Sequence, residues 1–140
     1  MTTIFDKFRM IGKTAVVTGG IGLLGKEFCR ALAQAGADVI VADLNAAGAE
    51  ETAAELRGEG GKAQGCGVDV TDKASVDRMT GFALEKTGRL DVLVCSAALD
   101  PKFDRTQGKH LNDFESYPLK MWRDALESTK IRRASCRERV

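Results

Sequence analysis

Residues 16–28 read VVTGGIGLLGKEF: an apolar run, then four glycines within seven residues, then an apolar and charged pattern of helical type. Glycines at this density indicate a backbone that turns tightly or that another group approaches closely. The stretch predicts a strand that passes into a helix through bare main chain. What lies against that main chain has to be inferred from the rest of the sequence.

Four short apolar runs rich in β-branched residues alternate with segments of helical periodicity. Continuous apolarity is typical of strands buried on both faces of a parallel sheet. The predicted strands are residues 14–18, 38–43, 62–70 and 91–97. The predicted helices carry apolar stripes, which are Leu24, Phe28, Ala31, Leu32 and Ala35 in the first, Ala46, Ala49, Ala53 and Leu56 in the second, and Val76, Met79, Phe82 and Ala83 in the third.

This alternation over residues 14–97 predicts an α/β fold, a doubly wound parallel sheet of the Rossmann type. Right-handed crossovers place the first two helices on one face of the sheet and the third helix on the other. With strands numbered along the chain, the expected order is 3-2-1-4, truncated after the fourth strand. Ligands of such sheets bind where the order reverses, here between the first and fourth strands.

The chain of 140 residues is short enough for one domain, expected over residues 1–127. No apolar run reaches the length of a membrane span, and the first residues lack the apolar stretch of a signal peptide. We therefore expect a cytoplasmic protein without a membrane partner. Residues 128–140 hold five of the 21 lysines and arginines and one of the 20 acidic residues. The body is then mildly acidic, with no basic footprint for nucleic acid.

The cysteines and the single histidine give no pattern of a disulfide framework or metal site. Cys29, Cys66, Cys95 and Cys136 are widely spaced, which predicts reduced thiols. His110 lies in a polar stretch, residues 99–118, which is expected to be a long loop with a solvated imidazole. A further helix is expected to begin near Leu119, with an apolar side that consists of Met121, Trp122, Ala125 and Leu126.

The glycine-rich turn falls at the predicted switch point of the sheet. Free N–H groups and the helix dipole favour a negatively charged group there, and bare main chain lets a dinucleotide's pyrophosphate approach closely. On this interpretation Gly19 permits the tight turn, Gly22 the close approach, and Gly25 the packing of the helix near the sheet. The candidate contacts of the turn are Gly19, Ile21, Gly22, Leu23 and Gly25.

Asp43 ends the second predicted strand, 24 residues after Gly19, near the spacing expected for an acid that binds the adenosine ribose. A carboxylate there accepts hydrogen bonds from both ribose hydroxyls and repels a 2′-phosphate. Asp43 thus favours NAD over NADP as cofactor. The alternative role is a helix cap or a solvated turn residue, although Asn45 is also placed to cap the next helix.

Over residues 10–127 the sequence resembles the short-chain dehydrogenase/reductase family. The resemblance rests on TGGIGLLG at 18–25, Asp43, the pair Asp69–Val70, and GRLDVLVCSAA at 88–98. It implies an NAD(P)-dependent oxidoreductase that moves hydride between nicotinamide and an alcohol or ketone carbon of a small substrate. It also implies contacts of Asp69 and the Val70 backbone with adenine, and of a further segment with the nicotinamide-side ribose, namely Cys95, Ser96, Ala97 and Ala98.

Two departures from the family pattern keep a second interpretation open. Leu23 stands where the classical branch has a glycine, and the glycine spacing is similar to that of the extended branch of sugar-nucleotide epimerases and dehydratases. Residues 95–98 replace the usual Asn-Asn-Ala-Gly. LDPKFD, residues 99–104, is similar to a subgroup linked to surface-carbohydrate genes, which suggests a carbohydrate-related substrate. A third interpretation is a non-catalytic NAD-binding module.

The catalytic elements of the family are not found in this chain. The family uses a serine followed by Tyr-x-x-x-Lys, whereas Tyr117 is followed by Lys120, one position too early, and Pro118 indicates a helix start. No catalytic residue is therefore assigned. Residues 128–140, STKIRRASCRERV, resemble a translated sequencing adapter, with a natural disordered tail as the alternative. We expect the chain alone to be an inactive N-terminal part of an enzyme that is a homo-oligomer at full length.

Overall fold

The computed structural model describes residues 3–98 and 118–137, with side chains described as far as Ser128 except that of Phe5. Four parallel strands form one sheet in the order β3-β2-β1-β4, which confirms the predicted Rossmann-type α/β fold. The strands are β1 (Thr14–Thr18), β2 (Asp38–Asp43), β3 (Lys62–Gly67) and β4 (Val92–Cys95). The helices are α1 (Ile4–Lys7), α2 (Leu23–Gln34), α3 (Ala46–Gly58), α4 (Lys73–Thr87) and α5 (Leu119–Arg137).

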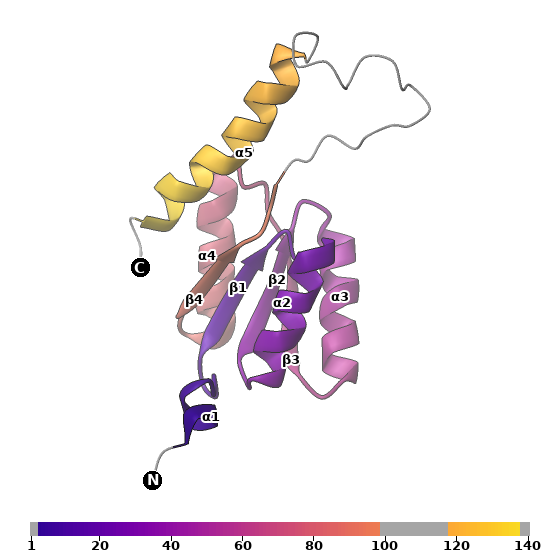
Figure 1. Cartoon of the computed structure of the whole chain (residues 1–140), viewed down its shortest axis with the longest axis vertical. Helices are drawn as coiled ribbons and strands as arrows, with labels where there is room; N and C mark the ends of the chain where they lie inside the picture. The colour runs from indigo at the N-terminus through magenta and orange to yellow at the C-terminus, as the bar shows by residue number, and fades with distance from the viewer. Residues whose placement is uncertain (1–2, 99–117, 138–140) are drawn as a thin grey trace.

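Helices cover both faces of the sheet, as the crossover rule predicts (Figure 1). On one face α2 and α3 pack on alternate residues of the strands, in a cluster that includes Val17, Val41 and Leu56. On the other face α4 packs on the intervening residues, in a cluster that includes Ile40 and Met79. Five residues of β1 and the four central residues of β2 are buried, so the two middle strands form the core.

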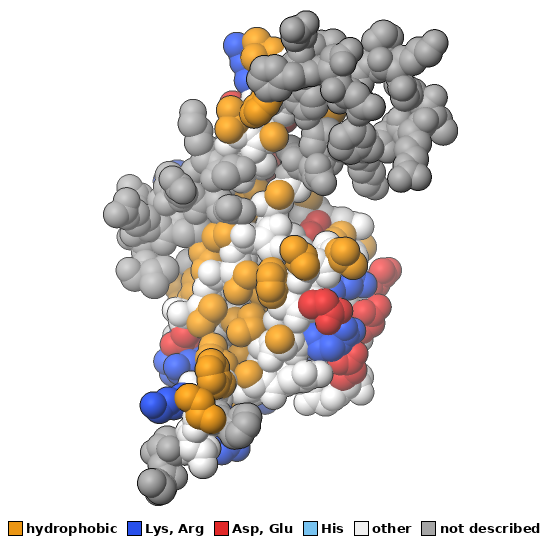
Figure 2. Space-filling view, in the orientation of Figure 1, with side chains coloured by type: hydrophobic (Ala, Val, Ile, Leu, Met, Phe, Trp, Pro, Cys, Tyr) orange, Lys and Arg blue, Asp and Glu red, His pale blue; other side chains and the backbone are white. Residues whose placement is uncertain are grey.

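The predicted apolar stripe of α2 is only partly correct, because Leu32 packs against the core whereas most of the other predicted residues do not. Leu24 and Phe28 are 64% and 41% exposed, whereas the buried face of the helix consists of Gly25 and Cys29. A helix that sits so close to the sheet has room only for small residues at its contact face, so the large side chains are displaced to the outside. Figure 2 shows the resulting hydrophobic surface over the region of α2, β1 and β4.

The stripes of α3 and α4 are largely confirmed. Three of the four predicted residues of α3 are buried, and Ala46 is exposed. In α4, Val76, Met79 and Ala83 are buried and Phe82 is half-buried against the same cluster.

The two outer strands are shorter than predicted. β3 ends at Gly67 instead of residue 70, and β4 covers Val92–Cys95 instead of residues 91–97. Residues 68–70 and 96–97 follow the two strands and line the pocket described below, although the Val68 and Ser96 N–H groups still donate to the neighbouring strand at 2.8 and 3.1 Å. Asp91 precedes β4 and exchanges hydrogen bonds with Thr14. Apolar content therefore predicted the strands, but the pairing partners determine where each one ends.

The helix predicted near Leu119 is confirmed as α5, which begins after Pro118. Its expected apolar side is only partly correct, because Trp122 and Leu126 are 43% and 51% exposed and Met121 and Ala125 are half-buried. The helix passes without a break through residues 127 and 128, where the domain boundary is expected. That boundary stays a prediction.

The segment GRLD, residues 88–91, aligns β4 with β1. Gly88 ends α4 in the left-handed conformation, with φ of 74°. Asp91 accepts a hydrogen bond from the Thr14 N–H at 2.8 Å and returns one from its own N–H to the Thr14 carbonyl at 2.9 Å. Arg89 pairs with both oxygens of the Asp91 carboxylate, which lowers the pKa of Asp91. The start of the β1/β4 register is therefore fixed by charged hydrogen bonds.

A pair of side chains on α3 covers the free edge of β3. Glu50 accepts a hydrogen bond from the Gly65 N–H at 2.8 Å, and Arg57 donates one to the Ala63 carbonyl at 2.8 Å. The two side chains are joined by an ion pair of 2.7 Å. Gly65 lies so close to α3 that a β-carbon would collide with the Glu50 backbone. Two groups on this edge, the Ala63 carbonyl and the Gly65 N–H, are thus occupied and not available to pair with another chain.

Replacing Glu50 by alanine removes this cover. We expect Glu50→Ala to lower the free energy of unfolding of the intact protein by about 1 kcal/mol, the usual value of one exposed charged contact. We also expect it to raise self-association in light scattering. Glu51→Ala is the matched control, because Glu51 is the exposed neighbour in α3 and its side chain makes no hydrogen bond or ion pair within the described residues. Equal behaviour of both variants would contradict the proposed cover.

The contribution of Glu50 is also expected to depend on pH. Its pKa lies below the ordinary value because Arg57 and the Gly65 N–H both donate to the carboxylate. Such a group adds stability that is fully present above its unfolded pKa and is lost as the pH falls through its folded pKa. The stability difference between wild type and Glu50→Ala should therefore be constant near neutral pH and shrink below about 4.5. A difference that grows with acidity would contradict this sign.

Candidate cofactor-binding site

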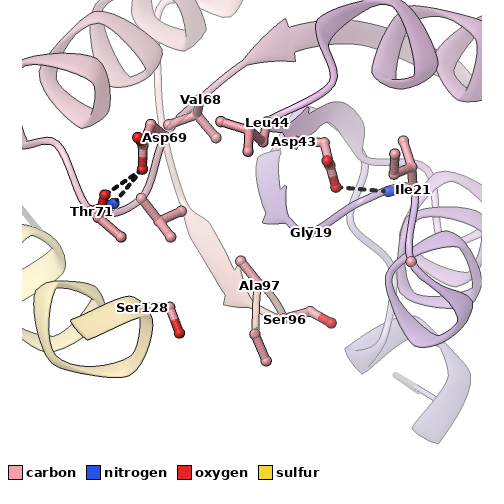
Figure 3. Close-up of a pocket in the computed structure, with 13 residues that line it drawn as sticks. Gly19, Ile21, Asp43, Leu44, Val68, Asp69, Thr71, Ser96, Ala97 and Ser128 are labelled. Atoms are coloured by element: carbon pink, nitrogen blue, oxygen red, sulfur yellow. Dashed lines mark hydrogen bonds between the residues drawn. The ribbon is translucent and has the colours of Figure 1, made fainter. Parts of the chain in front are cut away.

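A pocket of about 350 Å³ lies at the carboxyl ends of the strands, where the β1/β4 boundary forms the switch point. Its lining comes from four places in the chain: the glycine turn after β1, the end of β2, the segment after β3, and the segment after β4, with one residue from α5 (Figure 3). The lining residues are Gly19, Ile21, Gly22, Asp43, Leu44, Val68, Asp69, Val70, Thr71, Ser96, Ala97, Ala98 and Ser128.

Gly19 turns the chain at the tip of β1 and touches the segment after β4. Its φ of 69° is in the left-handed region, and a β-carbon would lie 2.7 Å from the Ala97 N and Cα atoms. The next residue, Gly20, is buried, and a β-carbon there would lie 2.6 Å from the Val41 Cγ1 atom. Gly19 therefore lets two backbones meet, whereas Gly20 leaves room for the side chain of Val41. The sequence analysis assigned no role to Gly20.

Gly22 and Gly25 open α2 in different ways. Gly22 is the N-cap residue of α2 and has no side chain with which to cap it. The main-chain N–H groups in the first turn of α2 therefore receive no hydrogen bond acceptor from the N-cap side chain. Gly25 is buried, and a β-carbon there would collide with the Gly19 carbonyl oxygen. Gly25 thus packs the helix on the glycine turn itself rather than on the sheet, which refines its predicted role.

Asp43 links the end of β2 to the glycine turn. One carboxylate oxygen accepts a long hydrogen bond from the Ile21 N–H at 3.4 Å, and the other accepts from the Asn45 N–H at 3.3 Å. The N-cap of α3 is Asn45, whose side chain accepts from the Gly48 N–H at 3.1 Å. Asp43 is therefore not the helix cap that the alternative role required. It is half-buried at the pocket wall, and both of its hydrogen bonds are weak.

Asp69 lies in the pocket wall after β3 and is held by its own turn. The N–H and the hydroxyl of Thr71 both donate to the same carboxylate oxygen, at 2.8 and 2.6 Å. Both hydrogen bonds lower the pKa of Asp69 from its ordinary value, and the bond from the Thr71 hydroxyl has the larger effect. The group is consequently an ionised acceptor at neutral pH. Val68 and Val70 provide apolar surface on either side of it in the sequence.

The segment after β4 forms the wall opposite the acidic side chains. Ser96 donates its N–H to the Thr18 carbonyl at 3.1 Å, which continues the pairing of β4 with β1 by one residue. Ser96, Ala97 and Ala98 line the pocket, and Ser128 of α5 reaches it from the other side of the gap (Figure 3). Cys95 is the last residue of β4, is half-buried and does not line the pocket.

Most of the candidate residues converge on this one pocket. The residues brought together are Gly19, Ile21, Gly22, Asp43, Asp69, Val70, Ser96, Ala97 and Ala98, and those outside the lining are Leu23, Gly25 and Cys95. Four lining residues were not predicted from the sequence, namely Leu44, Val68, Thr71 and Ser128. Leu44 and Val68 adjoin predicted acids at strand ends, so position alone could have suggested them. Nothing in the sequence indicated Thr71 or Ser128.

The remaining candidates lie outside this pocket or outside the described residues. His110 and Tyr117 belong to residues 99–117, which the structure does not describe. Lys120 is exposed on α5 and pairs with Asp124 at 2.6 Å, which raises the pKa of the lysine. Within the described ranges there is no cluster of metal-ligating side chains and no disulfide. None of the helices in those ranges is long and apolar enough to cross a bilayer.

Comparison with known proteins agrees with this geometry. The family model described as short chain dehydrogenase matches residues 13–128. The chain belongs to the short-chain dehydrogenase family. The match covers β1 to the first half of α5, so it includes every residue that lines the pocket.

Among curated relatives, 7alpha-hydroxysteroid dehydrogenase of Escherichia coli is 38% identical over 92 residues, which are 66% of this chain and 36% of that protein. D-threitol dehydrogenase of Mycolicibacterium smegmatis is 43% identical over 95 residues, 68% of this chain and 36% of that protein. A solved 7alpha-hydroxysteroid dehydrogenase complexed with NADH and 7-oxo glycochenodeoxycholic acid superimposes with a TM-score of 0.71 at 30% identity, covering 94% of this chain and 50% of that one. The chain spans about a third of the length of the curated relatives it matches.

The role of Gly22 can be tested apart from the fold. Its φ of −68° suits any residue, and a β-carbon would meet only the Gly19 oxygen at 3.2 Å. We expect Gly22→Ala in the intact protein to fold and to bind a nicotinamide dinucleotide at least about tenfold more weakly, because a methyl group stands where the diphosphate approaches.

The matched control is Gly81→Ala. Gly81 is exposed inside α4, a β-carbon there meets nothing within 4 Å, and alanine should stabilise the helix by about 0.5–1 kcal/mol. Calorimetric titration measures binding, and thermal unfolding measures stability. Unchanged dinucleotide affinity in Gly22→Ala would contradict the close approach of the diphosphate to Gly22.

Proposed function

We propose that the intact protein is an NAD-dependent oxidoreductase that moves hydride between nicotinamide and an alcohol or ketone carbon of a small substrate. The observation that carries the choice of NAD is the charge of the pocket. Its described lining contains two carboxylates, Asp43 and Asp69, and no lysine or arginine. A 2′-phosphate on the adenosine ribose would therefore meet negative charge without a cation to pair with.

The residues present fit a dinucleotide of this kind. The first turn of α2 offers main-chain N–H groups to a diphosphate, and Gly19 and Gly22 keep side chains out of its path. In this proposal Asp43 would accept hydrogen bonds from ribose hydroxyls, and Asp69 would accept one from the adenine base. The segment of Ser96, Ala97 and Ala98 would line the nicotinamide half. The cofactor, when bound, supplies the hydride acceptor or donor.

Within the proposal, this chain binds and orients the cofactor and does not transfer the proton. Lys120 is exposed and already paired with Asp124, so it is poorly suited to lower the pKa of a neighbouring tyrosine. We assign the proton-transferring residues, most of the substrate contacts and the subunit interface of a homo-oligomer to other parts of the intact protein. The relatives named above act on a hydroxysteroid and a polyol. A substrate with a secondary alcohol, such as a carbohydrate derivative, is the corresponding proposal here.

An extended-type epimerase or dehydratase is the second candidate, and the glycine spacing Gly19-x-x-Gly22-x-x-Gly25 favours it. In such an enzyme the cofactor is reduced and reoxidised within one turnover. Purified intact protein would then carry tightly bound cofactor and convert its substrate without net NADH production. Net production of NADH with an alcohol substrate would exclude this candidate.

Asp43 should decide between the two cofactors. We expect Asp43→Ala to weaken NADH binding by about tenfold or more, since charged hydrogen bonds contribute roughly 1.5–3 kcal/mol. NADPH binding should be unchanged or stronger, because the repulsion of the 2′-phosphate is removed. The measurement is fluorescence titration of the intact protein with each reduced coenzyme.

The matched control for this test is Asp38→Ala. Asp38 stands at the opposite end of the same strand, and within the described residues its carboxylate makes only a distant ion pair with Lys62, at 3.8 Å. This variant should retain the wild-type ratio of the two affinities. The same ratio of NADH to NADPH affinity in wild type and Asp43→Ala would overturn the assignment.

A further inference from the structure

The turn between β3 and α4 contains two aspartates, Asp69 and Asp72, that differ in how many of their carboxylate oxygens accept hydrogen bonds. Asp72 caps α4 with both carboxylate oxygens, one of which accepts from the Ala74 N–H at 3.0 Å and the other from the Ser75 N–H at 3.2 Å, and it also pairs with Arg78 at 3.8 Å. Asp69 is used on one side only. Both Thr71 donors go to its Oδ1 atom, and Oδ2 makes no hydrogen bond within the described part of the chain. Asp69 therefore keeps one strong acceptor for a ligand.

The backbone around Asp69 is fixed as firmly as its side chain. The Asp69 N–H donates to the hydroxyl of Ser75 at 3.0 Å, and the Asp72 N–H donates back to the Asp69 carbonyl at 3.2 Å. The side chain is then held by the two donors of Thr71, which Figure 3 shows as paired contacts at one end of the pocket. Without the hydroxyl, the carboxylate would retain one donor and gain rotational freedom.

A carboxylate held in this way discriminates between hydrogen-bond donors and acceptors on the ligand. An exocyclic amino group donates to Oδ2, whereas a carbonyl oxygen at the same place presents lone pairs to a negative charge and repels it. The neighbouring lining residues Leu44, Val68 and Val70 are apolar and offer no other donor from their side chains to compensate. Leu44 is 75% exposed in the structure, so it provides surface that a flat base could cover.

We propose that Thr71 is a positioning residue, whose hydroxyl and N–H fix the Asp69 carboxylate so that the site selects a base with an exocyclic amino group over one with a carbonyl. The inference rests on the proposed function, since it concerns the base of the bound dinucleotide. Thr71 is not among the cofactor contacts that the sequence predicted. Its hydroxyl supplies one of the two hydrogen bonds that hold the Asp69 carboxylate, so the preference for an amino group over a carbonyl should depend on that hydroxyl.

The test compares NADH with reduced nicotinamide hypoxanthine dinucleotide, in which the adenine amino group is replaced by oxygen. The variants of the intact protein are Thr71→Val, which removes the hydroxyl at nearly constant shape, and Thr71→Ser, which keeps it. Thr80→Val is the matched control. Thr80 also donates its hydroxyl to a nearby oxygen, that of Val76 at 3.0 Å, but it lies inside α4 and away from the pocket.

Wild type should bind NADH at least about tenfold more tightly than the hypoxanthine analogue, as expected for one charged hydrogen bond. Thr71→Val should lose most of this preference through weaker binding of NADH, and Thr71→Ser should restore it. Thr80→Val should keep the wild-type ratio. A Thr71→Val variant that keeps the ratio, or that loses affinity for both coenzymes equally, would overturn the proposal.

Two further outcomes separate this inference from the proposed function. Wild type that binds neither coenzyme contradicts the proposed function, whereas wild type that binds both equally contradicts only the selection by Asp69. A carboxyl titration by NMR gives an independent reading, with the pKa of Asp69 expected to rise in Thr71→Val and to stay low in Thr80→Val. Should Thr71→Val fail to fold, Thr71→Ala removes the same hydroxyl, and an unshifted Asp69 in wild type would already overturn the proposal.

Discussion

The structure depends on the contact of two stretches of bare backbone at the end of β1. Gly19 meets the main chain of Ala97, and the Gly19 carbonyl in turn meets Gly25 in the first turn of α2. No β-carbon fits at either glycine, so these contacts require a residue without a side chain. They bring the start of α2, the tip of β1 and the segment after β4 within van der Waals contact. The pocket exists because β1 and β4 end at the place where α2 begins.

The parallel register carries this arrangement to the rest of the site. Thr18 pairs with Cys95 and Ala42 on its two sides, so the strands β2, β1 and β4 end side by side. The side chains that follow each strand therefore meet at one edge of the sheet. Asp43 reaches the glycine turn from β2, and Asp69 approaches from the segment after β3, which joins β2 through the Val68 N–H to the Asp43 carbonyl at 2.8 Å.

The sequence predicted the features that follow from the repeated alternation of apolar runs and helical segments. β-branched runs identified β1 and β2 to the residue, and the crossover rule then set the order of the sheet and the faces of the helices. It failed where the size of a side chain matters more than its polarity: α2 buries Gly25 and Cys29, while Leu24 and Phe28 lie outside. It also missed Thr71, because a hydrogen bond between residues two apart leaves no periodic signal. Ser128 reaches the pocket through tertiary packing, on which local sequence has no bearing.

The central claim is that the diphosphate of a nicotinamide dinucleotide rests on the main chain between Gly19 and Gly25. Amide chemical shifts of the isotope-labelled intact protein during titration with NADH test it most directly. The account predicts saturable binding, with the largest shift changes at the amides of residues 19–25 and smaller ones at Asp43 and Asp69. Absence of binding, or saturable binding whose largest changes fall elsewhere in the protein, would contradict it.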